Sequence, residues 1–239
     1  MSGRDIKTQF YYGMRAGLPV VLGYIPVGIA YAVMARQAGF SVLETCGMSA
    51  AVYAGASQMM AAGMYAQGAG ILTLIITTFI LNLRHIIMST CVNNRLKNAG
   101  MGVRLLGSFG VTDEAFALFT TMPDKQCTTA FYLGLAGVTY LSWNVGTLIG
   151  ALASDILPPI ITAGLGISLY AMFIGLLIPG IKGNTRLGIL VIVTAAVNTV
   201  LSQFIPSSWA LIASTLLCAA AGVFFVDLDD EQGGDGNEH

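Results

Sequence analysis

Charged residues are scarce in this chain of 239 residues, where Asp, Glu, Lys and Arg together make up 10% of the sequence. Soluble domains average about 25%. With 55% apolar residues and a mean hydropathy of +0.75, the composition excludes an ordinary soluble domain and predicts a multi-pass membrane protein. The formal charge of −1 leaves no basic surplus that would favour nucleic acid as a partner.

Cysteine and histidine are also few. The four cysteines have neither C-x-x-C spacing nor metal-ligand spacing with the two histidines. They are Cys46, Cys91, Cys127 and Cys218. We interpret them as small apolar fillers, and we expect no metal site and no cofactor, since His239 lies in a polar tail and leaves His85 alone in the interior.

Glycine, by contrast, is abundant, with 29 residues in 239. Small residues let membrane helices pack closely, or break and expose backbone. Two pairs have GxxxG spacing, Gly13 with Gly17 and Gly146 with Gly150. We interpret this spacing as close helix packing.

The apolar residues form segments separated by short polar stretches, which predicts an all-α bundle of about seven to eight membrane segments, some broken or re-entrant. The segments are residues 17–34, 42–65, 71–92, 105–123, 131–153, 160–178, 187–204 and 209–226. We therefore divide the chain into a short basic N-terminal segment (1–16), a transmembrane domain (17–226) and an acidic, disordered tail (227–239).

The segment 71–92 would span about 33 Å as a helix, enough to cross a hydrocarbon layer of about 30 Å, yet Arg84 and His85 lie close to its middle. At about 100° per residue, Asn82 and His85 share one direction while Arg84 points elsewhere. Two polar directions need two sets of partners. Arg84 either lies at a membrane edge and extends outward or, as we favour, faces a cavity or neighbouring helices.

Two other segments carry features of broken helices. Pro26 removes a helical hydrogen bond and crowds the carbonyl of Leu22, so the helix should kink or open there and expose carbonyls to a substrate amine. A kink that only shapes packing is the alternative. In 42–65, Gln58 cannot extend out of the membrane from mid-segment and must find a partner.

Asp113 and Glu114 form an acidic pair flanked on both sides by apolar sequence. One interpretation is a helix N-terminus, where Thr112 caps and the carboxylates favour the helix dipole. The other is a carboxylate that faces Arg84 or His85, or that carries a proton during transport.

Orientation and symmetry are open at this stage. Positive-inside counting places the N-terminus, the 95–104 loop and the 182–186 loop in the cytoplasm, which simple alternation of eight segments cannot satisfy unless 42–65 or the Asp113 segment is re-entrant. A faint internal repeat predicts two similar halves around a binding site. It pairs Tyr53, Gly63 and Asn82 with Tyr170, Gly180 and Asn198.

Several short motifs carry a family resemblance. They are YIPVGIA at 24–30, YAGASQ at 53–58, NLRH at 82–85, FGVTDEAFA at 109–117, SW at 142–143 and GTLIGA at 146–151. With these in this order, the chain resembles the AzlC-type branched-chain amino acid exporter family, the large subunit of a two-component permease. The resemblance implies export of valine, leucine, isoleucine and methionine across the lipid bilayer of the cell (inner) membrane, together with a small AzlD-type membrane subunit.

A zwitterionic amino acid needs a cation for its carboxylate, an anion or carbonyls for its ammonium, and an apolar pocket. We predict substrate binding by Tyr24, Pro26, Tyr53, Gly55, Ser57, Gln58, Asn82, Arg84 and Trp143. We predict proton coupling by His85, Asp113 and Glu114. The alternatives are a passive channel and an intramembrane enzyme with His85 as base, although no nucleophile motif accompanies that histidine.

Overall fold

The computed structural model describes residues 3–96, 99–122, 128–157, 184–205 and 207–225, together with the single positions 164, 174, 178 and 181. Every regular element in these ranges is a helix, which confirms the all-α prediction. The chain forms two compact units, Met1–Met172 and Phe173–His239, which we describe separately. Nearly all of the predicted segment 160–178 and the whole tail 227–239 lie outside the described residues.

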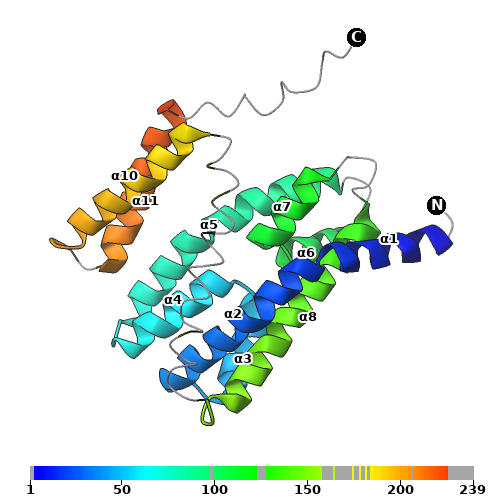
Figure 1. The fold of residues 1–239 in the computed structure, drawn as a ribbon, viewed down its shortest axis with the longest axis horizontal. Helices are drawn as coiled ribbons and strands as arrows, with labels where there is room; N and C mark the ends of the chain where they lie inside the picture. Colours follow the sequence, from blue (N-terminus) through cyan, green and yellow to red (C-terminus); the bar gives the residue numbers. More distant parts are fainter. Residues whose placement is uncertain are drawn as a thin grey trace. The chain divides into compact units, whose positions relative to one another are not determined.

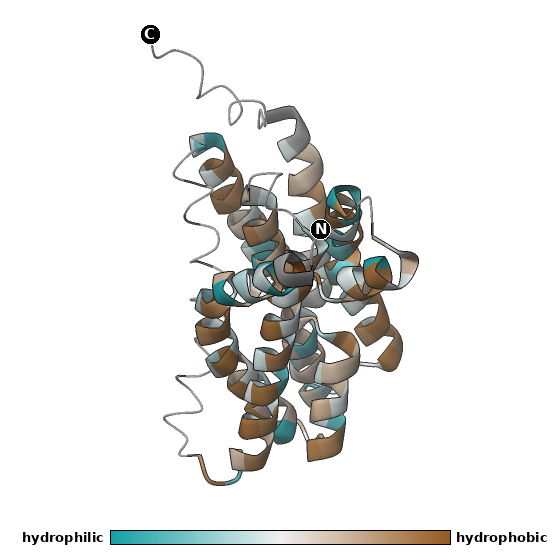
Figure 2. Ribbon diagram, turned by 90° about the vertical axis from the view of Figure 1, so that its right-hand side faces the viewer, coloured by the Kyte–Doolittle hydropathy of each residue, from teal (hydrophilic) through white to brown (hydrophobic). Residues whose placement is uncertain are grey.

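The first unit contains eight described helices, coloured blue to green in Figure 1. They are α1 (Gly3–Ala16), α2 (Leu18–Gln37), α3 (Val42–Val52), α4 (Gly55–Ala66), α5 (Ile71–Arg95), α6 (Met101–Phe109), α7 (Asp113–Thr121) and α8 (Thr129–Ala153). Among the described residues, α2, α5 and α8 are long and apolar enough to cross a membrane. Figure 2 shows hydrophobic residues on many of the helical turns. Helix α5 exposes large apolar side chains along its length, as a membrane helix does.

Glycines bring α2 and α8 into backbone contact. A Cβ added at Gly146 would lie 2.6 Å from the carbonyl oxygen of Ile25, and one at Gly150 would lie 2.6 Å from that of Ile29. At the other pair, Gly13 of α1 lies against the Phe131 carbonyl of α8. Close helix packing, the use that we predicted for both GxxxG pairs, is confirmed.

Helices α3 and α4 form a hairpin, which we call the first hairpin (42–66). Ser41 starts α3 with a capping box that includes Glu44, and α3 ends at Tyr53, whose φ of 46° is left-handed. The Phe40 ring, just before α3, lies 4.9 Å from the Tyr65 ring at the end of α4. The chain therefore enters and leaves the first hairpin at the same end of the unit.

Helices α6 and α7 form the second hairpin (101–121). The guanidinium of Arg95, where α5 ends, donates hydrogen bonds to the carbonyl oxygens of Phe119 and Met122 at 3.1 and 3.2 Å. The end of α7 thus returns to the end of α5, from which the chain also leaves for α6. Because the 25 residues of α5 span about 37 Å, the two hairpins enter from opposite ends.

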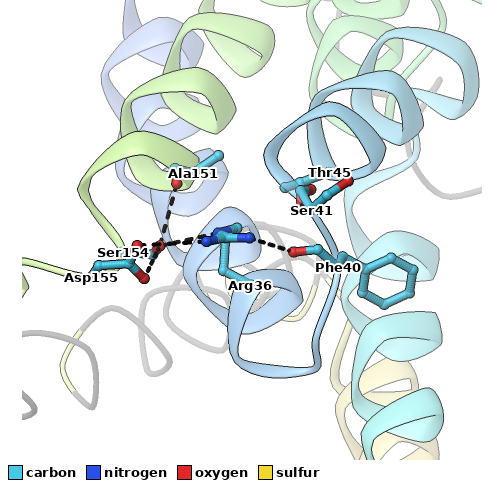
Figure 3. A network of polar contacts seen from close by, with 7 residues as sticks. All are labelled: Arg36, Phe40, Ser41, Thr45, Ala151, Ser154 and Asp155. Carbon is cyan, nitrogen blue, oxygen red and sulfur yellow. Dashed lines mark hydrogen bonds and ion pairs between the residues drawn. The ribbon is translucent and has the colours of Figure 1, made fainter.

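Arg36 connects α2, α8 and the start of α3 at the end of the unit where the chain enters the first hairpin (Figure 3). Its guanidinium donates to the carbonyl of Phe40 at 2.8 Å and to the hydroxyl of Ser154 at 3.3 Å, and lies 3.6 Å from the Asp155 carboxylate. Helix α8 therefore ends where α2 ends. The start of α2 lies at the opposite end with Arg95, so the N-terminus and the 95–104 loop share one side, as positive-inside counting requires.

Helix α2 continues through Pro26 without a break, so the helix does not open there, and a kink at Pro26 stays a prediction. The proline still leaves the Leu22 carbonyl without its helical donor. The neighbouring turns are held by the packing of α2 on α8, which accounts for the intact helix.

The second unit contains α10 (Thr185–Leu201) and α11 (Ser207–Phe225), which pack antiparallel. Ser214 donates to the Asn198 side chain at 3.3 Å, and Gly222 lies against Leu190. Tyr170 and Gly180 of the predicted repeat lie outside the described residues, so the repeat stays a prediction.

Candidate functional site

The tips of the two hairpins meet inside the first unit, and we call residues 53–58 and 109–114 the hairpin junction. The Tyr53 ring lies 6.2 Å from the Phe109 ring of the second hairpin and 4.9 Å from the Tyr140 ring of α8. Both family-like motifs of the hairpins, 53–58 and 109–117, fall on the breaks. A helix break in a membrane protein is tolerated where protein or water covers the backbone, so these breaks mark a site.

The two polar directions of α5 find separate partners. Asn82 donates to the Ser57 hydroxyl of the first hairpin at 3.1 Å. Arg84 forms an ion pair with Asp113 of the second hairpin, with 3.0 Å between Nη2 and Oδ2. Arg84 is the fourteenth of 25 residues in α5, so it lies in the middle of that helix, between the two hairpins.

The acidic pair satisfies both interpretations at once. Thr112 caps α7 by accepting a hydrogen bond from the Ala115 amide, and Asp113 and Glu114 occupy the first turn, where the helix dipole favours negative charge. Asp113 also meets Arg84. A capping position and an ion pair across the junction are therefore compatible.

Tyr24 of α2 donates a hydrogen bond to Oε2 of Glu114. Tyr24 is buried and Glu114 is partly buried. The two residues are separated by 90 positions, so no sequence spacing connects them. Their contact joins α2 to the second hairpin.

Unpaired polar atoms gather at this place. Within the described ranges, four buried atoms of predicted site residues have no hydrogen-bond partner, namely Tyr53 Oη, Asn82 Oδ1, Arg84 Nε and His85 Nδ1. His85 also lies within electrostatic reach of Asp113. Buried polar groups are normally satisfied, so a concentration of exceptions marks a candidate binding region.

Ser49 of α3 holds the first hairpin to α8 and was not among our predicted site residues. Its hydroxyl accepts hydrogen bonds from the Gln58 amide at 3.0 Å and the Trp143 indole at 3.2 Å, and lies 2.8 Å from the Thr147 hydroxyl. Gln58 thus has the partner that its position demands. A serine in a run of small residues gives no sequence signal for such a role.

Trp143 packs against the break between α3 and α4 and is enclosed by residues of α2 and the first hairpin. Its ring stacks on Tyr31 at 6.1 Å and meets the edge of Tyr24 at 5.6 Å, and a Cβ at Gly55 would lie 2.6 Å from it. Trp143 and Gly55 therefore support the first hairpin, and Pro26 is exposed on α2. Contact of these three residues with substrate stays a prediction.

Metal-ligating side chains do not cluster in the described part of the chain, where no group of three or more His, Cys, Asp or Glu could hold an ion. The junction supplies negative charge from Asp113 and Glu114, and the middle of α5 beside it supplies positive charge from Arg84. This arrangement suits the binding of a small polar solute.

Spanning helices around two opposed, broken hairpins, with charged residues of the second hairpin and of α5 where the hairpins meet, define a membrane transport protein. The chain belongs to the AzlC protein family, whose model matches residues 19–157. The match covers α2 to α8 and therefore the whole hairpin junction.

Individual relatives agree with this assignment. An uncharacterised membrane protein of Archaeoglobus fulgidus is 36% identical over 180 residues, covering 74% of this chain and 78% of the relative. The inner membrane protein YgaZ of Escherichia coli is 31% identical over 188 residues, covering 76% and 77%. The branched-chain amino acid transport protein AzlC of Bacillus subtilis is 25% identical over 174 residues, covering 70% and 68%. No solved structure matches the chain.

Proposed function

We propose that this protein exports branched-chain amino acids, namely valine, leucine and isoleucine, and also methionine, in exchange for protons. We further propose that it works as the large subunit of a permease with a small AzlD-type membrane subunit. The family membership and the name of the Bacillus subtilis relative support the substrate class.

The observation that carries the proposal is the pairing of opposite charges at the hairpin junction. Arg84 has a buried Nε without a partner and offers a cation for the substrate carboxylate. Glu114 offers an anion for the ammonium group. Met59, buried in the first hairpin, adds apolar surface for a branched side chain.

The three residues that we predict to couple protons have different charged partners. Asp113 forms an ion pair with Arg84, so its carboxylate already has a cationic partner. His85 lies beside that pair and interacts electrostatically with both Arg84 and Asp113. Glu114 makes no ion pair with any described residue and is our choice for the proton carrier.

The test is transport in liposomes that contain the protein together with the small subunit. We expect saturable efflux of labelled valine, leucine, isoleucine and methionine that accelerates when an inward proton gradient is imposed. An electrical leak without saturable counterflow of leucine would identify a channel instead and contradict the proposal.

A further inference from the structure

Glu114 stands out because nothing described in the chain neutralises its charge. Its neighbour Asp113 takes the guanidinium of Arg84 at 3.0 Å. Glu114 receives a hydrogen bond from Tyr24, whose phenol is neutral at physiological pH. A carboxylate that is partly removed from water without a cationic partner is costly, and a proton or a bound cation removes that cost.

The groups around Glu114 come from each packed element. Helix α2 contributes Tyr24, the tip of the first hairpin contributes Tyr53, and its own helix contributes Thr112 and Asp113. Helix α5 contributes Arg84 and His85, which lie toward Asp113, while Arg95 at its end donates to the Phe119 carbonyl. No described basic residue is therefore paired with Glu114 itself.

The Tyr53 hydroxyl is a second, independent pointer to a ligand. The residue is 2% exposed and lies near Glu114, and its oxygen has no hydrogen bond of ordinary geometry with a described residue, Thr139 being a polar side chain within its reach. An amino acid ammonium group has three N–H donors. One can donate to the Glu114 carboxylate and another to the Tyr53 oxygen.

We propose that Glu114 holds either a proton or the ammonium group of the substrate, and that this mutual exclusion couples export to proton entry. The inference rests on the proposed export function and adds the group at which the two fluxes meet. The acid form of Glu114 releases its proton to cytoplasmic water before the ammonium N–H groups donate to the carboxylate. After the amino acid leaves outside, a proton from external water binds the same oxygen. The ammonium keeps its own protons, so one proton enters for each amino acid exported.

Calorimetric binding of leucine to the purified two-subunit complex tests this exclusion, in two buffers with different ionisation enthalpies. We expect the Kd to rise about tenfold per pH unit below the pH at which the carboxylate protonates, with about one proton released per leucine bound there. In Glu114→Gln, which retains an acceptor for Tyr24, we expect a Kd that does not change with pH and no proton release.

The matched control is Glu44→Gln, because Glu44 is an exposed carboxylate that serves only the capping box of α3. It should leave both the pH dependence and the proton release as in the unsubstituted protein. Should Glu114→Gln fail to give a monodisperse complex, Tyr24→Phe provides a second variant. It keeps the carboxylate but removes the donor to its charged form, so the pH below which binding weakens should shift upward.

The outcomes separate the two proposals. If the unsubstituted complex does not bind leucine at any pH, the export function is overturned. Binding to the unsubstituted complex without proton release, or a Tyr24→Phe variant with an unchanged pH dependence, would overturn the exclusion at Glu114 and leave the substrate assignment standing.

Discussion

Ser49 shows how much can depend on one small side chain. Because Gln58 and Trp143 both donate to its oxygen, the two lone pairs are occupied and the hydroxyl hydrogen is directed to Thr147. The serine is fully buried, as are the amide and indole that bind it. The three interactions fix α3, α4 and α8 to one another.

We predict that Ser49→Ala destabilises the protein by about 2–4 kcal/mol, because it leaves two buried N–H donors without an acceptor. Thermal unfolding of the detergent-solubilised protein measures the loss. Ser202→Ala is the control, since that hydroxyl donates only to the Thr199 carbonyl of its own helix. Equal unfolding temperatures for the two variants would contradict the role assigned to Ser49.

Some contacts of single residues follow from the sequence and others do not. The ion pair of Arg84 was among the predicted alternatives because a buried guanidinium needs an anion and few acidic residues lie within apolar sequence. The bond between Tyr24 and Glu114 could not be predicted, since a tyrosine in a membrane segment has many potential acceptors. The partner of Gln58 was required by burial but unidentified, because serines are common near it.

At the scale of elements, helix contacts depend on where a side chain would collide. Gly146 and Gly137 both lie in α8, but a Cβ at Gly146 would meet the Ile25 carbonyl at 2.6 Å while one at Gly137 would meet nothing within 4 Å. The pair therefore separates packing from helix propensity, which favours alanine over glycine equally at both positions.

We predict that Gly146→Ala lowers stability by about 1–3 kcal/mol, because the backbones of α2 and α8 must separate. Gly137→Ala should be neutral or slightly stabilising. The yield of monodisperse protein and its unfolding temperature report both effects. A similar loss in both variants would show that the helix approach at Gly146 is not what limits stability.

The two hairpins make a topological prediction that cysteine labelling tests in a background without native cysteines. Gln37→Cys and Gln67→Cys, at the ends of α2 and α4, should react with an impermeant reagent from the same, external side. Arg15→Cys and Met101→Cys should react only from the cytoplasmic side. Reaction of positions 37 and 67 from opposite sides would mean that 42–66 crosses the membrane.

The positions of the apolar helices could be predicted from the sequence. Whether each segment crosses the bundle or turns back could be predicted only in part. Apolar runs and glycine content predicted the helices and the interruption of 42–65, and charge counting required a re-entrant segment. Each hairpin ends at the same end of the unit where it begins. This is visible only from contacts between distant positions, such as Phe40 with Tyr65 and Arg95 with Phe119. The helix does not open at Pro26, because packing on α8 holds α2 together across the proline.

At the scale of the whole molecule, the proposed exchange moves charge. A zwitterion is neutral, so one proton entering per amino acid leaving carries one positive charge inward. A membrane potential is worth about 2.3 kcal/mol per charge per 100 mV, which corresponds to about a 50-fold gradient of substrate.

We therefore predict that a potassium diffusion potential, negative on the cytoplasmic side, drives leucine export from liposomes without any pH gradient. The same potential should have no effect on Glu114→Gln. The readout is labelled leucine released after valinomycin is added. Export that responds to a pH gradient but not to the potential would exclude one-for-one exchange.

The enclosure of Trp143 also supplies an optical reporter. The sequence has two tryptophans, and the other, Trp209, belongs to the second unit and is 45% exposed. Trp209→Phe therefore leaves a single fluorophore lodged among α2, α8 and the first hairpin, with its N–H fixed by Ser49. The wavelength of its fluorescence emission maximum will shift when that hairpin moves, and no attached dye is needed.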